Sequence, residues 1–139
     1  MLEKITELAE KQKKISDFHL RSESDIAYRL LGDIIVAPDS KISEKDLEDL
    51  LKKNCSESDI KKFNSHWELD TAVMLGSLRF RANFFKTLNG SGAVLRRVET
   101  KVPLMDDLML PQVLYELLDA QKGLVLVTGP TGSGKSTTL

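Results

Sequence analysis

Eight consecutive residues close to the C-terminal end of the chain have the types needed to hold a triphosphate. Residues 129–136, GPTGSGKS, match the pattern GxxxxGK[ST] at every fixed position. Glycines at these places let backbone N–H groups approach phosphate oxygens without a Cβ in the way. Lys135 would place its charge between the β- and γ-phosphates, and the Ser136 hydroxyl would ligate Mg²⁺. The pattern predicts a nucleoside triphosphate site with magnesium, without choosing between ATP and GTP.

The predicted site comprises the loop and the first residue after it. Its nucleotide-binding members are Gly129, Thr131, Gly132, Ser133, Gly134, Lys135, Ser136 and Thr137. Hydrolysis also requires a carboxylate in the Mg²⁺ shell and a group that orients the attacking water. The printed sequence stops three residues after the loop, at Leu139. We therefore expect a truncated piece of a longer ATPase that is inactive as these 139 residues alone.

A basic segment precedes the loop. The net charge is only −1, but six basic residues and one acidic residue, Glu99, lie between Arg79 and Lys101. Such a cluster favours an anionic ligand. A solvated strand face would have the same composition, and the sequence alone leaves both interpretations open.

The composition, 41% apolar and 29% charged, is typical of a folded globular protein and excludes collagen-like and wholly disordered chains. No apolar run approaches the roughly 20 residues of a membrane-spanning helix, so we predict no transmembrane segment. The N-terminus lacks the apolar run of a signal peptide. Cys55 is the single cysteine, which excludes an intramolecular disulfide.

Hydrophobic periodicity predicts the elements that must position these residues. Helices are expected over 2–14, 43–54, from Ser56 to about Trp67, and over 111–120. Strands are expected over 17–21, 25–30, 33–37, 68–74, 78–87, 93–98 and 124–127, with a turn at 89–92. The order of helix, three strands, two helices and three strands is α+β rather than alternating βαβ. The run at 124–127 has the pattern of a strand buried on both faces.

Four segments upstream of the loop, together with the loop itself, carry a family resemblance. They are Ser16-Asp17-Phe18-His19-Leu20, Arg29-Leu30-Leu31-Gly32-Asp33, Arg79-Phe80-Arg81-Ala82-Asn83 and Gly90-Ser91-Gly92-Ala93-Val94-Leu95-Arg96. With the continuous stretch from Gly123 to Leu139, they resemble the secretion ATPase superfamily of type II secretion and type IV pilus motors. Because the loop comes early in the chain, the sequence most resembles the pilus-retraction type. An assembly or type II secretion ATPase, and a non-catalytic subunit-interaction domain, remain alternatives.

The resemblance implies an architecture and a setting. It implies a PAS-like domain over 1–100, with an antiparallel sheet and flanking helices, a linker and helix over 101–122, and the start of a RecA-like ATPase domain over 123–139. It implies ATP and Mg²⁺ as cofactors and a homohexamer on the cytoplasmic side of the inner membrane. The implied partner is an inner-membrane pilus platform protein. The resemblance implies no binding of nucleic acid.

The resemblance also implies roles for two arginines. Arg81 and Arg96 would reach the nucleotide phosphates from the N-terminal domain and act in catalysis with Lys135. Strand alternation places Arg96 and Arg97 on opposite faces, so one of them at most can line a given cleft. For His19 we expect a structural hydrogen bond or a subunit contact rather than a metal. Trp67 and the phenylalanines are expected in the core, and Cys55 is expected to be inert.

Overall fold

The computed structural model describes residues 2–99, 103–130 and 133–139. The chain divides into two compact units, Met1–Val98 and Glu99–Leu139, which we call unit 1 and unit 2. Each is described by itself.

Unit 1 is built on one six-stranded antiparallel sheet with the strand order β3-β2-β1-β6-β5-β4. Its strands are β1 (Ile15–Arg21), β2 (Ala27–Leu30), β3 (Asp33–Val36), β4 (Glu68–Leu75), β5 (Leu78–Thr87) and β6 (Gly90–Val98). The first and last strands of the chain segment, β1 and β6, pair at the centre, so residues far apart in sequence become neighbours. The predicted mixture of helices with an antiparallel sheet is confirmed.

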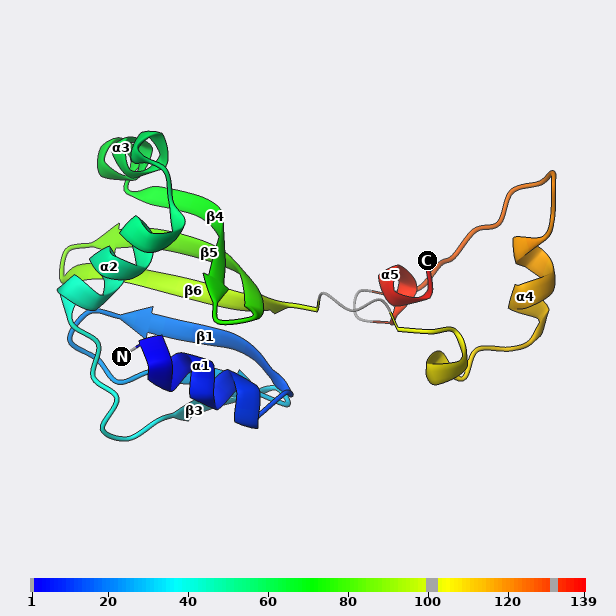
Figure 1. Ribbon diagram of the computed structural model, residues 1–139, viewed down its shortest axis with the longest axis horizontal. Coiled ribbons are helices and arrows are strands. Elements are labelled where there is room, and N and C mark those ends of the chain that lie inside the picture. Colours follow the sequence, from blue (N-terminus) through cyan, green and yellow to red (C-terminus); the bar gives the residue numbers. More distant parts are fainter. Residues whose placement is uncertain (1, 100–102, 131–132) are drawn as a thin grey trace. The chain divides into compact units, whose positions relative to one another are not determined.

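Three helices accompany the sheet, α1 (Leu2–Lys11), α2 (Glu44–Asn54) and α3 (Glu57–His66). Figure 1 shows α1 and α2 in front of the sheet and α3 beside the β4 edge. Their apolar sides cover one sheet face, where Phe18, Phe80 and Phe84 are buried. Helix α1 contributes Ile5 and Ala9, and the loops before β2 and after β3 contribute further apolar residues. One sheet face is therefore a core, and the opposite face is left open by these helices.

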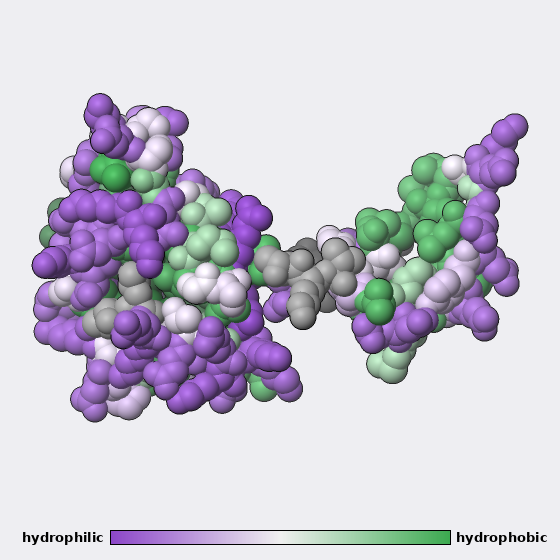
Figure 2. Space-filling view, in the orientation of Figure 1, coloured by the Kyte–Doolittle hydropathy of each residue, from purple (hydrophilic) through white to green (hydrophobic). Residues whose placement is uncertain are grey.

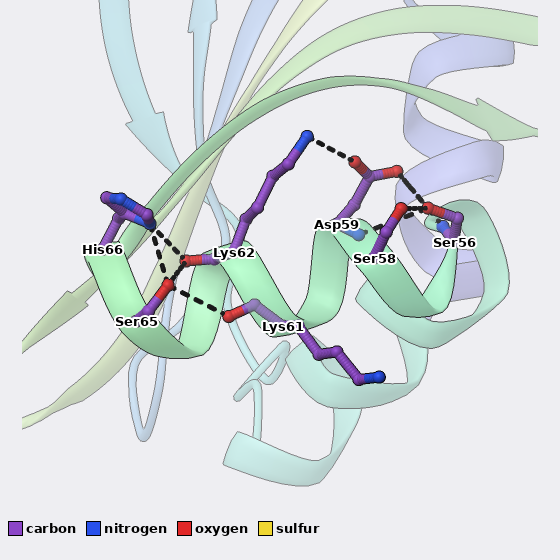
Figure 3. Close-up of polar contacts among 7 residues, drawn as sticks. All are labelled: Ser56, Ser58, Asp59, Lys61, Lys62, Ser65 and His66. Atoms are coloured by element: carbon purple, nitrogen blue, oxygen red, sulfur yellow. Dashed lines mark hydrogen bonds and ion pairs between the residues drawn. The ribbon is translucent and has the colours of Figure 1, made fainter.

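Local sequence explains where the second and third helices begin. The side chains of Ser43 and Ser56 each accept a hydrogen bond from the backbone N–H three residues on. In turn, the side chains of Asp46 and Asp59 accept a hydrogen bond from the backbone N–H of Ser43 and Ser56. These two reciprocal capping boxes fix the first turns of the helices predicted to begin at Ser43 and Ser56. Figure 3 shows the second box, with Asp59 facing Ser56 at the start of α3, and Ser65 bonded to carbonyls near the end of the helix.

The hairpin turns follow from residues that accept positive φ. Leu31 and Gly32 have φ values of 53° and 102° and connect β2 to β3 in two residues, the geometry of a type I′ turn. Gly76 begins the equally short connection from β4 to β5. A third two-residue turn, Leu88 and Asn89, joins β5 to β6 in the register that places Arg81 opposite Arg96.

Unit 2 has little regular structure in its described residues. It contains the 3₁₀ turn η1 (Asp106–Leu108), the short helix α4 (Val113–Leu118) and the one-turn helix α5 (Lys135–Thr138). None of its described residues is buried. Tyr115 donates a hydrogen bond to Asp106, which raises the pKa of the Tyr115 hydroxyl.

Several boundaries differ from the sequence predictions. The first helix ends at Lys11 rather than 14, and the helix predicted over 111–120 spans Val113–Leu118. The turn predicted over 89–92 is wrong. The chain reverses at Leu88 and Asn89, and Gly90 already pairs with Thr87 in the ladder. Glycines in β6 misled the prediction, because here they serve close packing rather than a turn.

Two predictions of burial are also wrong. Trp67 is 60% exposed, because it ends α3 in a left-handed conformation at the rim of the sheet, where its own carbonyl accepts a hydrogen bond from Lys86. The segment 124–127 forms no strand, and Leu124, Val125 and Leu126 are exposed. A buried strand needs hydrogen-bonded neighbours on both sides, and no described residue pairs with this segment.

Candidate functional site

Arg81 and Arg96 lie side by side on the open face of the sheet. They are directly opposite each other in the β5–β6 register, and strand alternation points both away from the core that holds Phe80 and Leu95. Together with Asp70, Asn83 and Val94 they line a shallow depression of about 320 Å³. The structure therefore brings together the two arginines that the sequence singled out.

Arg96 is anchored by a buried carboxylate on the neighbouring strand. Its Nε donates a 2.8 Å hydrogen bond to Oδ1 of Asp17, the residue opposite it in the β1–β6 register. Oδ2 of Asp17 accepts from Ser16 Oγ at 2.7 Å and lies 3.7 Å from Nε of Arg29. Burial alone would raise the pKa of Asp17, but the hydrogen bonds from Arg96 and Ser16 outweigh it and hold the pKa below its usual value. The carboxylate is thus ionised at neutral pH.

Arg81 is held much more loosely. Its terminal Nη2 lies 3.4 Å from Oδ2 of Asp70, and both side chains are largely exposed, at 71% and 56%. Exposed pairs of this kind contribute about 0–1 kcal/mol to stability. Arg81 can therefore exchange Asp70 for another anion at little cost.

Arg97 belongs to the opposite face of the sheet. Its Nη1 donates a 2.8 Å hydrogen bond to the carbonyl oxygen of Ala9 in α1, on the helix-covered side. The prediction that Arg96 and Arg97 point to opposite faces is confirmed. Arg97 supports the packing of α1, and Arg96 is the one available on the open face.

His19 also lies on the open face, in a hollow lined by Ala27, Phe85 and Val94, among other residues. Its Nε2 is buried and has no hydrogen-bond partner among the described residues. Within the described ranges no three His, Cys, Asp or Glu side chains could share a metal ion. Nε2 of His19 thus makes no hydrogen bond within the described residues, and the expected structural hydrogen bond or subunit contact stays a prediction.

Of the phosphate-binding pattern in unit 2, the structure describes Gly129, Pro130 and residues 133–136, the last two of which begin α5. Gly129 and Gly134 have φ values of 151° and 89°, and a Cβ on Gly129 would lie 2.7 Å from Ser133 Oγ. Glycine is therefore required at both positions. Lys135 Nζ donates to the carbonyl oxygens of Gly129 and Pro130, at 2.8 and 2.7 Å. To bind a phosphate, the ammonium group of Lys135 must give up its hydrogen bonds to these two carbonyl oxygens.

The remaining loop residues are exposed where they are described. Ser133, Ser136 and Thr137 are open to solvent, whereas Thr131 and Gly132 lie outside the described residues. The backbone N–H groups of Thr137 and Thr138 both bond back to the Gly134 carbonyl and form the single turn of α5. A hydroxyl at Ser136 is accessible to a cation carried by a nucleotide.

The comparison with protein families identifies the class of protein. The family described as "Type II/IV secretion system protein" matches residues 53–139, more than half of the chain. The chain belongs to this family. Among the described residues, every helix is too short or too polar to cross a lipid bilayer.

Several individual proteins resemble the chain along almost its whole length. The type IV pilus retraction ATPase PilT of Pseudomonas aeruginosa is 38% identical over 125 residues, 89% of this chain and 36% of that protein. The uncharacterised protein YggR of Escherichia coli is 37% identical over 139 residues, 99% of this chain and 41% of that protein. This chain thus spans well under half the length of either relative.

Solved structures show the same fold. The crystal structure of the pilus retraction motor PilT with bound ADP covers 99% of this chain, and 40% of its own chain is matched. Its TM-score is 0.81 and its sequence identity 36%. The ATPase DotB of Legionella pneumophila gives a TM-score of 0.74 at 25% identity, over 98% of this chain and 39% of its own. These likenesses include both units of the chain.

Sequence reasoning missed Asp17 and Arg29 as parts of the open-face cluster. Asp17 lies within a recognised motif, and its alternation with the core residue Phe18 placed it on the outer face. That it would accept a bond from Arg96 depends on the β1–β6 pairing across 79 positions of sequence. No local signal in the sequence specifies such a pairing.

Proposed function

We propose that this chain is the N-terminal part of a hexameric ATPase motor that powers type IV pilus retraction. The observation that carries the proposal is the likeness to PilT along nearly the whole chain, at a TM-score of 0.81, combined with a complete GPTGSGKS loop. Residues 1–100 would be a PAS-like domain, 101–122 a linker and helix, and 123–139 the beginning of a RecA-like domain.

In this proposal ATP and Mg²⁺ occupy the loop. Lys135 exchanges its two backbone carbonyls for β- and γ-phosphate oxygens, and Ser136 ligates Mg²⁺. Backbone N–H groups from Gly129 to Thr137 surround the phosphates. Arg81 and Arg96 contact the phosphates from the open face of the sheet, where guanidinium groups can bind phosphate oxygens in pairs.

The proposal also gives the motor a setting. As a homohexamer it would act on the cytoplasmic side of the inner membrane, against a platform protein of the pilus machine, without nucleic acid. We further propose that residues 1–139 alone do not hydrolyse ATP. A Mg²⁺-shell carboxylate and a water-orienting group are both required for turnover, and the GPTGSGKS loop itself contains no acidic side chain.

The test is a Lys135→Ala exchange in the full-length protein, measured both as ATPase activity of the purified hexamer and as pilus retraction in cells. We expect ATP hydrolysis to be lost and pili to be made but not withdrawn. Lys122→Ala, an exposed lysine outside the loop, is the matched control and should behave as wild type. Retraction at the wild-type rate in the Lys135 variant would contradict the proposal.

The two arginines have a separate test. Arg81→Ala or Arg96→Ala in the full-length hexamer should lower ATPase activity at least about tenfold, because each removes a charged donor from the transferring phosphate. Wild-type rates in either variant would remove that residue from the site and leave the role of the loop intact.

A secretion or pilus-assembly ATPase is the second candidate. It is favoured by the family description, which includes type II and type IV secretion, and by the shared fold with DotB. The same Lys135→Ala strain distinguishes the two. Loss of surface pili would indicate an assembly motor, and loss of an exported protein with normal retraction would indicate secretion.

A further inference from the structure

We propose that Asp17 is a positioning residue that fixes the guanidinium group of Arg96 for contact with the nucleotide phosphates. This inference rests on the proposed function, because it requires a phosphate at the open face. It adds a residue that acts through Arg96 and does not touch the nucleotide.

The position of Asp17 makes its carboxylate a rigid anchor. Its side chain is only 8% exposed, although it lies on the open face. One oxygen accepts from Arg96 Nε and the other from Ser16 Oγ, with Arg29 Nε close by. A carboxylate bonded on both oxygens and packed among its neighbours cannot rotate freely, so the group it binds is also fixed.

The hydrogen bond from Arg96 Nε to Asp17 leaves the two terminal nitrogens of the Arg96 guanidinium group available for a ligand. Arginine carries five N–H donors, and Asp17 uses the one on Nε. The four donors on the two terminal nitrogens form the fork that matches two phosphate oxygens. The Arg96 side chain remains 72% exposed, and among the described residues Asp17 is its one ion-pair partner. The terminal fork is therefore presented to solvent from a fixed base.

Arg81 provides an internal contrast on the same face. Asp70 binds it through a terminal nitrogen, and that carboxylate is itself exposed. A phosphate would have to displace Asp70 before it could use both terminal nitrogens of Arg81. Arg96 needs no such exchange, and holding its guanidinium in advance lowers the ordering cost of binding. Asp17 thus makes Arg96 the better-prepared of the two contacts.

The experiment is a double-mutant cycle on ATP hydrolysis by the full-length hexamer, with Asp17→Asn, Arg96→Ala and both together. We expect Asp17→Asn to lower kcat/KM about tenfold and to have no further effect in the Arg96→Ala background. Asp49→Asn, an exposed carboxylate on α2, is the control and should match wild type. Thermal melting of each variant reports folding separately.

The kinetics of the variants test the positioning role of Asp17 and the phosphate role of Arg96 separately. Additive losses in the double variant, or normal kinetics for Asp17→Asn beside a defective Arg96→Ala, overturn the positioning role. Normal kinetics for Arg96→Ala overturn the proposed phosphate role of Arg96 and the inference with it.

A second measurement avoids variants that fail to fold. In the wild-type chain, nuclear magnetic resonance should show a slowly exchanging Nε–H for Arg96 and a rapidly exchanging one for Arg81. Equally rapid exchange of both would overturn the inference.

Discussion

Apolar residues are buried in unit 1 and largely exposed in unit 2. In unit 1, alternating residues such as Phe80, Ala82 and Phe84 disappear into a core between the sheet and its helices. In unit 2, the continuous run from Leu124 to Leu126 is exposed and Val127 is half-buried. In Figure 2 hydrophobic residues form broad green areas on the visible face of unit 2, whereas the visible face of unit 1 is mostly hydrophilic. An apolar pattern specifies burial only where the chain also supplies the surface that buries it.

The largest expected contrast is between a core residue of unit 1 and an apolar residue of unit 2. Phe80 is fully buried and packs edge-on against Phe18, with ring centroids 6.0 Å apart. Phe80→Ala should lower the free energy of unfolding by about 3–5 kcal/mol. Leu126→Ala, at a residue that is 74% exposed, should change it by less than about 0.5 kcal/mol. Urea unfolding followed by circular dichroism measures both, and equal effects would contradict the contrast between a unit with a buried core and one whose described residues are all at least partly exposed.

A smaller effect is expected at the close contact between the central strands. A Cβ on Gly92 would lie 2.6 Å from Phe85 Cζ and 3.0 Å from the Leu20 carbonyl oxygen. Gly92→Ala should destabilise unit 1 by about 1–3 kcal/mol, because the backbone oxygen cannot move aside cheaply. The double variant with Phe85→Leu should recover part of the loss. An unchanged urea midpoint for Gly92→Ala would show that the β1–β6 contact is looser than the structure indicates.

The helix cap of α2 should contribute about 1 kcal/mol to the free energy of unfolding. Ser43→Ala removes the acceptor for the Asp46 N–H and half of the capping box. Ser77→Ala, at an exposed position in the turn between β4 and β5, is the matched control and should be neutral. Thermal melting of the two variants tests the comparison, and a neutral Ser43→Ala would mean that α2 is held by its buried leucines alone.

The smallest change in the free energy of unfolding per group is expected when acid protonates single carboxylates of unit 1. Hydrogen bonds from Ser43 lower the pKa of Asp46, and the pKa of Glu44 is lowered by bonds from Ser91 and Ser22 that outweigh the effect of burial. Groups with a lowered pKa stabilise the fold fully above their unfolded values, 3.8 and 4.5 here, and lose that contribution as pH falls through the folded value.

Unfolding free energies measured from neutral pH to about pH 2 should therefore decline below about pH 4.5. Asp46→Asn should show a lower stability at neutral pH and a smaller decline, because one of the titrating groups is gone. A decline as steep as that of wild type would show that Asp46 does not take part in the acid transition.

Much of unit 1 could be predicted from its sequence because its signals are local. The helices predicted to begin at Ser43 and Ser56 do begin there, because each serine and the aspartate three residues later form a capping box. Alternation placed Arg81 on the face opposite Phe80 and put Arg96 and Arg97 on opposite faces of their own strand. The predictions failed at Trp67 and at Gly90–Gly92, where residue type suggests one role and the position in the sheet gives another.

The sequence by itself determined most elements of unit 1, the glycine requirement of the phosphate-binding loop and the placement of Arg96 and Arg97 on opposite faces of their strand. These depend on interactions within a few residues or on the two-residue repeat of a strand. Only the tertiary structure decided which strands are neighbours, and with them the pairing of Arg96 with Asp17 and of Arg81 with Asp70. Strand order is chosen by packing of the whole core, which no short segment encodes.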